Sequence, residues 1–361
     1  MTVWLLTFLV HSTLWCGMAW LILRLFPRTH ARLRETIWYT ALAASLITPV
    51  ARAVNSQQSA VWQLRMPALA ASAEGLHSEG KRGHVDGAAS VSVAAGQQAA
   101  GILWFTVAGG LVTVYLVRLR AMRRRIVHRE PVVDRRACDA LAALSRRAAL
   151  DPAPRLTESH SLGSPIAIGV GARREICVPV RALHELDGNE WPALLGHEVA
   201  HHLRRDTIRL AVLNVLQSVF FFQPLFRLAA RELQLAAEEQ CDDWAASQLD
   251  DPLSVASCLA EVAGWVVPRD RCTPVPCFGR HRRQLELRVR RLMDEDHTRH
   301  APSRGWRRAG SVALLAIAPL AAPAIAPAGE ASHGDGRSFE HVQQEHGEMR
   351  ERAAARGWLG L

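Results

Sequence analysis

Four stretches of the sequence contain no Asp, Glu, Lys or Arg and approach the length needed to cross a lipid bilayer. They are Thr2–Leu23, Thr36–Ala51, Ala99–Val117 and Ala309–Gly329. A membrane-spanning helix needs about 20 mostly apolar residues, because the hydrocarbon layer is about 30 Å thick. We therefore predict a mainly α-helical membrane protein with about four transmembrane helices, although the prolines of the fourth stretch weaken a helix there.

The first stretch is also where a cleaved signal peptide would lie. Its apolar run is longer than a signal-peptide core, and no basic residue precedes it. No cleavage site of small residues follows it either. We therefore interpret Thr2–Leu23 as a membrane helix that stays in the protein.

The positions of the basic residues predict how the chain is oriented. Arginines are dense in residues 24–34, 118–129 and 304–308 and sparse in residues 52–98. Loops rich in Lys and Arg stay in the cytoplasm, so we expect a multi-pass protein of the inner (cytoplasmic) membrane with both termini outside. The net charge of +9 then reflects contact with membrane lipid, and we expect no direct binding of nucleic acid.

The same reasoning divides the chain into six parts. We predict two transmembrane helices in residues 1–55, an external flexible loop in 56–98, a third transmembrane helix in 99–118, a cytosolic domain in 119–308, a fourth transmembrane helix in 309–329 and a short external tail in 330–361. Six of the seven cysteines fall in the cytosolic part, where thiols stay reduced.

Local patterns within residues 119–308 predict both helices and strands. A helical pattern covers Ala137–Leu150, and short β-type runs cover Pro165–Gly169 and Glu175–Pro179. Residues 187–190 are typical of the capped start of a helix. We interpret the apolar run Leu210–Phe222 as a core or membrane-dipping helix. The basic amphipathic helix His281–Met293 presents either a solvated face or a contact with membrane or partner.

Residues 197–201 (HEVAH) carry the clearest chemical signal. His197 and His201 are four residues apart, so their imidazoles project from the same face of a helix and can bind one metal ion. Glu198, beside the first histidine, can accept a proton from a water molecule at that ion. His202 points about 100° away from His201, so we do not expect it to be a ligand.

A downstream acidic cluster, Glu238–Asp243, offers the third ligand that a catalytic zinc site requires. Glu238 and Asp242 share one helix face, and Glu239 and Asp243 share the next, so spacing alone does not choose between the two pairs. An aspartate one turn after a ligand glutamate is well placed to hold a ligand histidine by its other ring nitrogen.

Residues 160–243 resemble the peptidase domain of bacterial integral-membrane zinc metallopeptidases of the BlaR/MecR antirepressor type. The matching segments are Ser164–Gly169, Ile176–Pro179, Leu195–Asp206 and Glu238–Asp242. The resemblance implies a cytosolic α+β zincin-like peptidase domain, a gluzincin-like HExxH and ExxxD site, Glu238 as third Zn²⁺ ligand and Asp242 as the residue that supports a ligand. Since only residues 330–361 follow the fourth stretch, we expect no penicillin-binding sensor domain.

We therefore expect a membrane-embedded zinc endopeptidase that transmits a signal by cutting a cytosolic protein, such as a transcriptional repressor, or itself. The strand near Ser164–Gly169 would pair with an extended substrate. One alternative is an HtpX-like protease of membrane-protein quality control, which Cys241-Asp242 disfavours. The other is a non-catalytic transducer with a structural metal, which would not need Glu198. The sequence leaves the oligomeric state open.

Overall fold

The structure is a computed structural model, and it describes residues 2–27, 29–54, 63–65, 85–126, 128–188, 190–249, 251–265, 278–293 and 324–326. The chain divides into two compact units, Met1–Ser56 with Ala88–Ala322 and Gln57–Gly87 with Pro323–Leu361. The second unit contains a parallel pair of short strands, β1 (Gln63–Arg65) and β6 (Ala324–Ala326). The first unit contains the candidate site.

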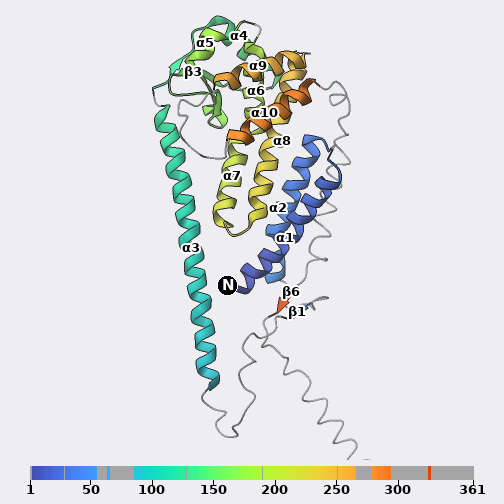
Figure 1. Ribbon diagram of the computed structural model, residues 1–361. Helices are drawn as coiled ribbons and strands as arrows, with labels where there is room; N and C mark the ends of the chain where they lie inside the picture. The colour runs from blue at the N-terminus through green and yellow to red at the C-terminus, as the bar shows by residue number, and fades with distance from the viewer. Residues whose placement is uncertain are drawn as a thin grey trace, which may run out of the picture. The chain divides into compact units, whose positions relative to one another are not determined.

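Three long helices account for the apolar stretches of the N-terminal third (Figure 1). They are α1 (Thr2–Leu25), α2 (Ala31–Val54) and α3 (Val85–Arg125). Among the described residues two helical segments, Trp4–Leu25 and Gln98–Arg125, are long and apolar enough to cross a membrane. The α3 segment is only 11% buried, so most of its large apolar side chains, such as Ile102, Leu103 and Phe105, are exposed within this chain.

The prediction of four membrane helices is therefore too high for the part of the chain that the structure describes. The second stretch, Thr36–Ala51, is helical within α2 but does not qualify as a span. Its uncharged run ends at Glu35 on one side and Arg52 on the other, so it is shorter than the bilayer thickness. Helix α2 instead packs against α1 through buried polar contacts, including His11 Nδ1 at 3.0 Å from Thr48 Oγ1.

The fourth stretch, Ala309–Gly329, lies almost wholly outside the described residues. Its described residues, Ala324–Ala326, form strand β6 and not part of a helix. Prolines flank this strand at positions 323 and 327, and proline in a helix interior removes a hydrogen bond and clashes with the preceding turn. The helix predicted there is wrong at these three residues.

Residues 130–179 contribute a small four-stranded sheet to the first unit. Its strand order is β2 (Glu130–Pro131), β3 (Arg155–Ser159), β5 (Glu175–Pro179) and β4 (Ile166–Ile168). Strands β3 and β5 are parallel, and β4 is antiparallel to β5. All five residues of β5 are buried, whereas β4 is an edge strand with one row of backbone groups unpaired within the described sheet. The strands predicted at 165–169 and 175–179 are confirmed.

The helices after β2 follow in the order α4 (Arg135–Arg147), α5 (Val180–Glu185), α6 (Trp191–Arg204), α7 (Asp206–Val219), α8 (Pro224–Leu249), α9 (Pro252–Trp265) and α10 (Phe278–Met293), with a 3₁₀ turn η1 at Gly171–Arg173. Helix α6 begins at Trp191, and Glu190 Oε2 accepts a hydrogen bond from the Asp187 backbone N–H at 3.0 Å. Proline lies in the first turn, where its missing N–H has no helical partner to lose.

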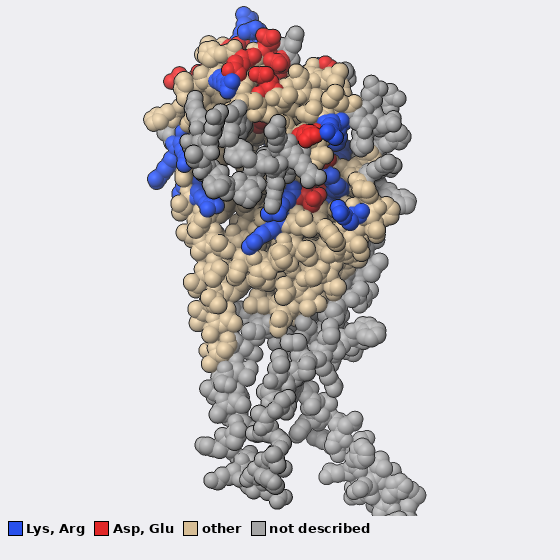
Figure 2. Space-filling view, viewed as in Figure 1, with Lys and Arg blue, Asp and Glu red and all other residues tan. Residues whose placement is uncertain are grey.

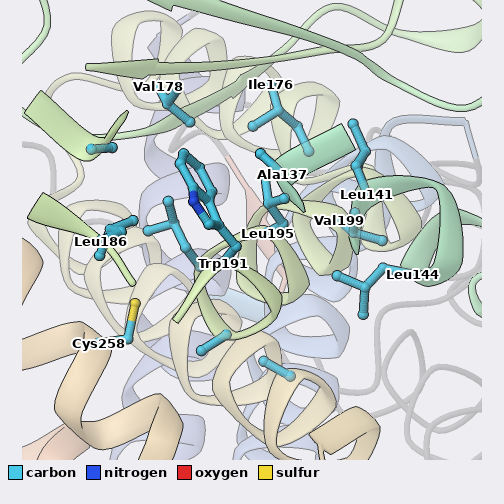
Figure 3. Packing of buried hydrophobic residues seen from close by; sticks show 14 of the residues in the cluster. Ala137, Leu141, Leu144, Ile176, Val178, Leu186, Trp191, Leu195, Val199 and Cys258 are labelled. Atoms are coloured by element: carbon cyan, nitrogen blue, oxygen red, sulfur yellow. The ribbon is translucent and has the colours of Figure 1, made fainter. Parts of the chain in front are cut away.

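Two hydrophobic clusters hold these helices, and α8 belongs to both. The first joins α4, the sheet, α6, α9 and the C-terminal half of α8, with the fully buried Trp191 among side chains of β5 and α6 (Figure 3). The second joins α1 and α2 to α7 and the N-terminal half of α8. Gln223, between α7 and α8, donates hydrogen bonds to Ser12 Oγ at 2.6 Å and Thr13 Oγ1 at 3.1 Å.

The helix predicted at Leu210–Phe222 is found as the second part of α7, which ends at Val219. The ring of Phe220, just after this helix, stacks on Phe8 of α1, one of the two candidate membrane helices, with ring centroids 4.1 Å apart. Charged side chains are unevenly distributed over the face of the molecule that Figure 2 shows. They gather on the upper part of the face that Figure 2 shows, while the described surface below it is free of Lys, Arg, Asp and Glu.

Candidate metal centre

Two histidines of α6 point to one place. The 3.6-residue helical period brings His197 and His201 together, and their Nε2 atoms lie 3.1 Å apart. Their ring planes are inclined at 85°, so the two nitrogens converge without the rings stacking. Between them, Glu198 is 7% exposed and lies in the lining of the adjoining cavity.

Helix α8 brings Glu238 to the same point. Glu238 Oε2 lies 3.4 Å from His197 Nε2, and Oε1 lies 3.8 Å from His201 Nε2. The two helices can approach closely because residue 196 is glycine: a Cβ there would lie 3.3 Å from Ala245 Cβ. A small residue immediately before the first histidine thus brings the two helices within ligand distance.

The three donor groups fit a metal ion. Their ligand atoms all lie within 4.8 Å of one another. A tetrahedral zinc ion with bonds of about 2.0–2.2 Å would hold its ligand atoms about 3.3–3.6 Å apart, close to the separations found here. Two imidazole nitrogens and one carboxylate oxygen are also the donor set of many catalytic zinc sites, with a fourth position left for water.

Each histidine also has a carboxylate at its other ring nitrogen. Asp242 Oδ1 lies 2.9 Å from His197 Nδ1, and Asp206 Oδ2 lies 2.9 Å from His201 Nδ1. A carboxylate at Nδ1 fixes the tautomer and leaves Nε2 free to bind a metal. Asp242 lies where the sequence analysis expects a supporting aspartate. Asp206 was not singled out there, although it closes the Leu195–Asp206 segment used for the resemblance.

The turn between α6 and α7 explains the position of Asp206. Arg205 has a left-handed conformation with φ of 60°, and its N–H bonds to the His202 carbonyl at 3.1 Å. This ends α6 and starts α7 at once, so the first residue of α7 turns back toward His201. This turn cannot be predicted from the sequence, because arginine rarely adopts a positive φ.

Arg288 of α10 is a second residue that the sequence analysis missed. Its Nε and Nη2 each lie 2.7 Å from a carboxylate oxygen of Asp242, and its Nη1 lies 3.0 Å from Glu238 Oε2. Arg291, about one turn after Arg288 in α10, pairs with Asp243 of α8. The basic face predicted for 281–293 therefore binds the acidic cluster of α8 at these positions.

These contacts determine the charges of the site in the absence of an ion. Burial alone would lower the pKa of His197, but Asp242 and Glu238 outweigh it and raise this pKa to about 10. Burial raises the pKa of Asp242, and the opposing effects of Arg288 and His197 bring it below its usual value. Burial likewise raises the pKa of Glu198, which the nearby histidines offset only in part.

His202 lies outside the group, as expected. Its Nε2 lies 3.1 Å from the Glu175 backbone carbonyl of β5, and burial lowers its pKa. A second set of potential ligands, His201, Asp206 and Cys241, lies close by. Burial raises the pKa of the Cys241 thiol well above its usual value, and a metal binds the thiolate. Asp206 is also occupied by Arg204, at 3.1 Å, so this set fits a metal less well.

A cavity of about 1040 Å³ adjoins the site. Its lining includes Glu198, both ligand histidines, the β4 segment and apolar residues of α9, and it continues along the C-terminal end of α3. An extended peptide could lie in it beside the free edge of β4. The arrangement thus combines three groups that could bind one metal ion, a buried carboxylate and a cavity large enough for an extended peptide.

The chain matches a known protein family. The model described as BlaR1 peptidase M56 matches residues 3–251, which is more than half of the chain. The matched range contains His197, Glu198, His201, Glu238 and Asp242, whereas Arg288 lies outside it. No curated protein matches the chain.

Proposed function

The chain belongs to the BlaR1 peptidase M56 family, and from this premise we propose that it is a membrane-bound zinc endopeptidase. In this proposal His197, His201 and Glu238 hold the zinc ion, and Glu198 is the general base. The observation that carries it is the convergence of these three ligand groups from α6 and α8 next to a cavity that Glu198 also lines.

The chemistry divides between the metal and the protein. A bound zinc ion would supply Lewis acidity, which polarises the scissile carbonyl and makes a water molecule easier to deprotonate. Glu198 would accept the proton of the attacking water and pass it to the nitrogen of the leaving amine. Its raised pKa suits this role, because a base whose pKa is closer to neutral also returns the proton more readily.

The substrate would be positioned by the protein backbone. Strand β4 is at the edge of the sheet and lines the cavity with Glu198. An extended peptide added to this edge would form backbone hydrogen bonds that do not depend on its sequence. Side chains of the peptide could then enter the apolar part of the cavity along α9, where Val255, Leu259 and Val262 lie.

We further propose that the substrate is a cytosolic protein such as a transcriptional repressor, so that cleavage transmits a signal received at the membrane. Two candidate membrane helices and the family match support an association with the membrane. The arginines at the C-terminal end of α3, Arg123–Arg125, support a cytosolic location for the region that follows, since such clusters stay inside.

The test is the replacement Glu198→Gln in cells that carry the full chain. Removing the base should lower cleavage by about 10²- to 10⁴-fold. The readout is the set of cytosolic proteins that are truncated with the wild type and intact with the variant. As a control, Glu185→Gln changes an exposed glutamate that pairs with Arg181 on α5 and should leave cleavage unchanged. Wild-type cleavage by a Glu198→Gln protein that still contains zinc would refute the proposed role.

A further inference from the structure

Glu35, near the start of α2, has a partly buried carboxylate that is bound by side chains of three other helices. Its Oε1 accepts a hydrogen bond from Arg204 Nη2 of α6 at 2.9 Å and is also bound by Arg209 of α7. Its Oε2 accepts from Gln240 Nε2 of α8 at 2.8 Å. The side chain is only 13% exposed. Glu35 is thus one of the residues that join the N-terminal helix pair to the helices of the metal centre.

Arg204 connects Glu35 to a residue of the metal centre. While its Nη2 binds Glu35, its Nε donates to Asp206 Oδ2 at 3.1 Å. Its Nη1 donates to Gln240 Oε1 at 2.7 Å. The guanidinium is planar and rigid, so its three contacts are fixed relative to one another. A change at Glu35 therefore changes the position of Arg204 relative to Asp206.

Asp206 completes the connection, because the same oxygen that binds Arg204 lies 2.9 Å from His201 Nδ1. Orientation of a ligand histidine by a carboxylate at its second ring nitrogen affects metal affinity. The hydrogen bonds of this chain are partly buried, with Asp206 5% exposed and Arg204 and Glu35 each 13% exposed. Polar contacts shielded from water are more strongly coupled than exposed ion pairs. A continuous chain of hydrogen bonds thus runs from α2 to a ligand of the metal.

We propose that Glu35 is a positioning residue for the metal centre, because it orients the ring of His201 through Arg204 and Asp206. Metal affinity then depends on the position of the α1–α2 pair relative to α6. Helix α1 contains a candidate membrane span and packs on α2. A displacement of this pair would then raise the dissociation constant of the metal. The inference rests on the proposed function only for the identity of the metal ligands.

The experiment measures zinc affinity of the full-length protein in lipid nanodiscs by competition with a chelator. Glu35→Gln should raise the dissociation constant by about 2- to 30-fold, the range found for residues that couple to a site without touching its ligand. The visible spectrum of the Co²⁺-substituted protein should shift, because the orientation of one imidazole changes. The matched control is Arg34→Gln.

Arg34 is a suitable control because, like Glu35, it joins α2 to α8, but it is not part of the hydrogen-bond chain that leads to His201. It pairs with Glu239 of α8 at 2.7 Å, and both side chains are similarly buried. Arg34→Gln should leave the zinc dissociation constant within about twofold and the Co²⁺ spectrum unchanged. An equal effect of the two variants would overturn the proposal, because it would show that any loosening of α2 weakens the site.

A double-mutant cycle separates a role through Asp206 from a general loss of stability. If Glu35 acts through Asp206, the Glu35→Gln/Asp206→Asn protein should bind zinc no more weakly than Asp206→Asn alone. Additive losses, or a wild-type dissociation constant for Glu35→Gln, would refute the proposal. Should Glu35→Gln not accumulate in folded form, Arg204→Gln interrupts the same chain and should show the same non-additivity.

The two proposals can fail separately in this experiment. A wild-type protein that binds no zinc at this site would remove the proposed function. A wild-type protein that binds zinc as tightly as Glu35→Gln would remove only the role of Glu35, because the affinity measurement does not depend on proteolysis.

Discussion

The two histidines of the metal centre are held by different regions of the molecule. The ring of His197 contacts Asp242 of α8, and Asp242 is bound by Arg288 of α10. Both residues belong to the C-terminal helices of the first unit. His201 is held from the side of the N-terminal helices, by Asp206, which is linked through Arg204 to Glu35 of α2. One metal ion would therefore depend on two independent supports.

The two supports also differ in how they are built. Asp242 is fully buried and its two oxygens are bound by two nitrogens of one arginine. Asp206 shares Arg204 with Glu35 and Gln240, so its arginine keeps partners if the aspartate is changed. The first support resembles a fixed structural element, and the second can transmit a displacement. This difference predicts different effects for the two aspartates.

The largest effect is expected for Asp242→Asn. The change leaves Arg288 buried with only Glu238 as a charged partner, and removing one member of a buried ion pair costs about 3–5 kcal/mol. Chemical unfolding of the metal-free protein in detergent should show a loss of this size. The neighbouring Asp243→Asn serves as control, because Asp243 is 39% exposed and pairs with Arg291. A loss below about 1 kcal/mol for Asp242→Asn would show that the support of His197 is not the rigid one.

A smaller change in stability but a clear change in metal affinity is expected for Asp206→Asn. An amide at this position cannot supply the carboxylate that orients His201, and such changes weaken metal binding by about 10- to 100-fold. Arg204 keeps Glu35 and Gln240, so the free energy of unfolding should fall less than with Asp242→Asn. Competition with a chelator measures the zinc dissociation constant, and chemical unfolding measures the free energy of unfolding. The Asp139→Asn change on α4, where Asp139 is exposed and pairs with the exposed Arg135, should change neither the zinc affinity nor the free energy of unfolding. An unchanged zinc affinity for Asp206→Asn would contradict a supporting role.

Local sequence patterns were enough to predict the elements that carry the site. The helix of residues 197–201, the two strands before it and the acidic helix after it all follow from periodicity and spacing. The predictions that rested only on the length of an uncharged run, namely the second and fourth membrane helices, were not confirmed. The uncharged run of α2 is too short to qualify as a membrane span, and the part of 309–329 that the structure describes is a strand between prolines.

The supports of the ligands could not be predicted, because they depend on which helices meet. Arg288 lies 46 residues from Asp242, and Glu35 lies 169 residues from Arg204. Periodicity places each of these residues on a helix face but does not say which face it contacts. The left-handed turn at Arg205 that brings Asp206 back to His201 has no sequence signal either. Glu238 and Asp242 were chosen over Glu239 and Asp243 only by the resemblance, and Glu238 is the member of the cluster that lies with the two histidines.

X-ray absorption at the zinc edge of the zinc-loaded full-length protein tests the central claim most directly, because two sets of potential ligands share His201. We predict a first shell of nitrogen and oxygen only, at about 2.0–2.2 Å, with the multiple-scattering pattern of two imidazoles. The Glu238→Gln protein should lose this signal at equal added zinc. A sulfur atom at about 2.3 Å would contradict the account, since the metal would then lie with Cys241 and Asp206 instead of between His197, His201 and Glu238.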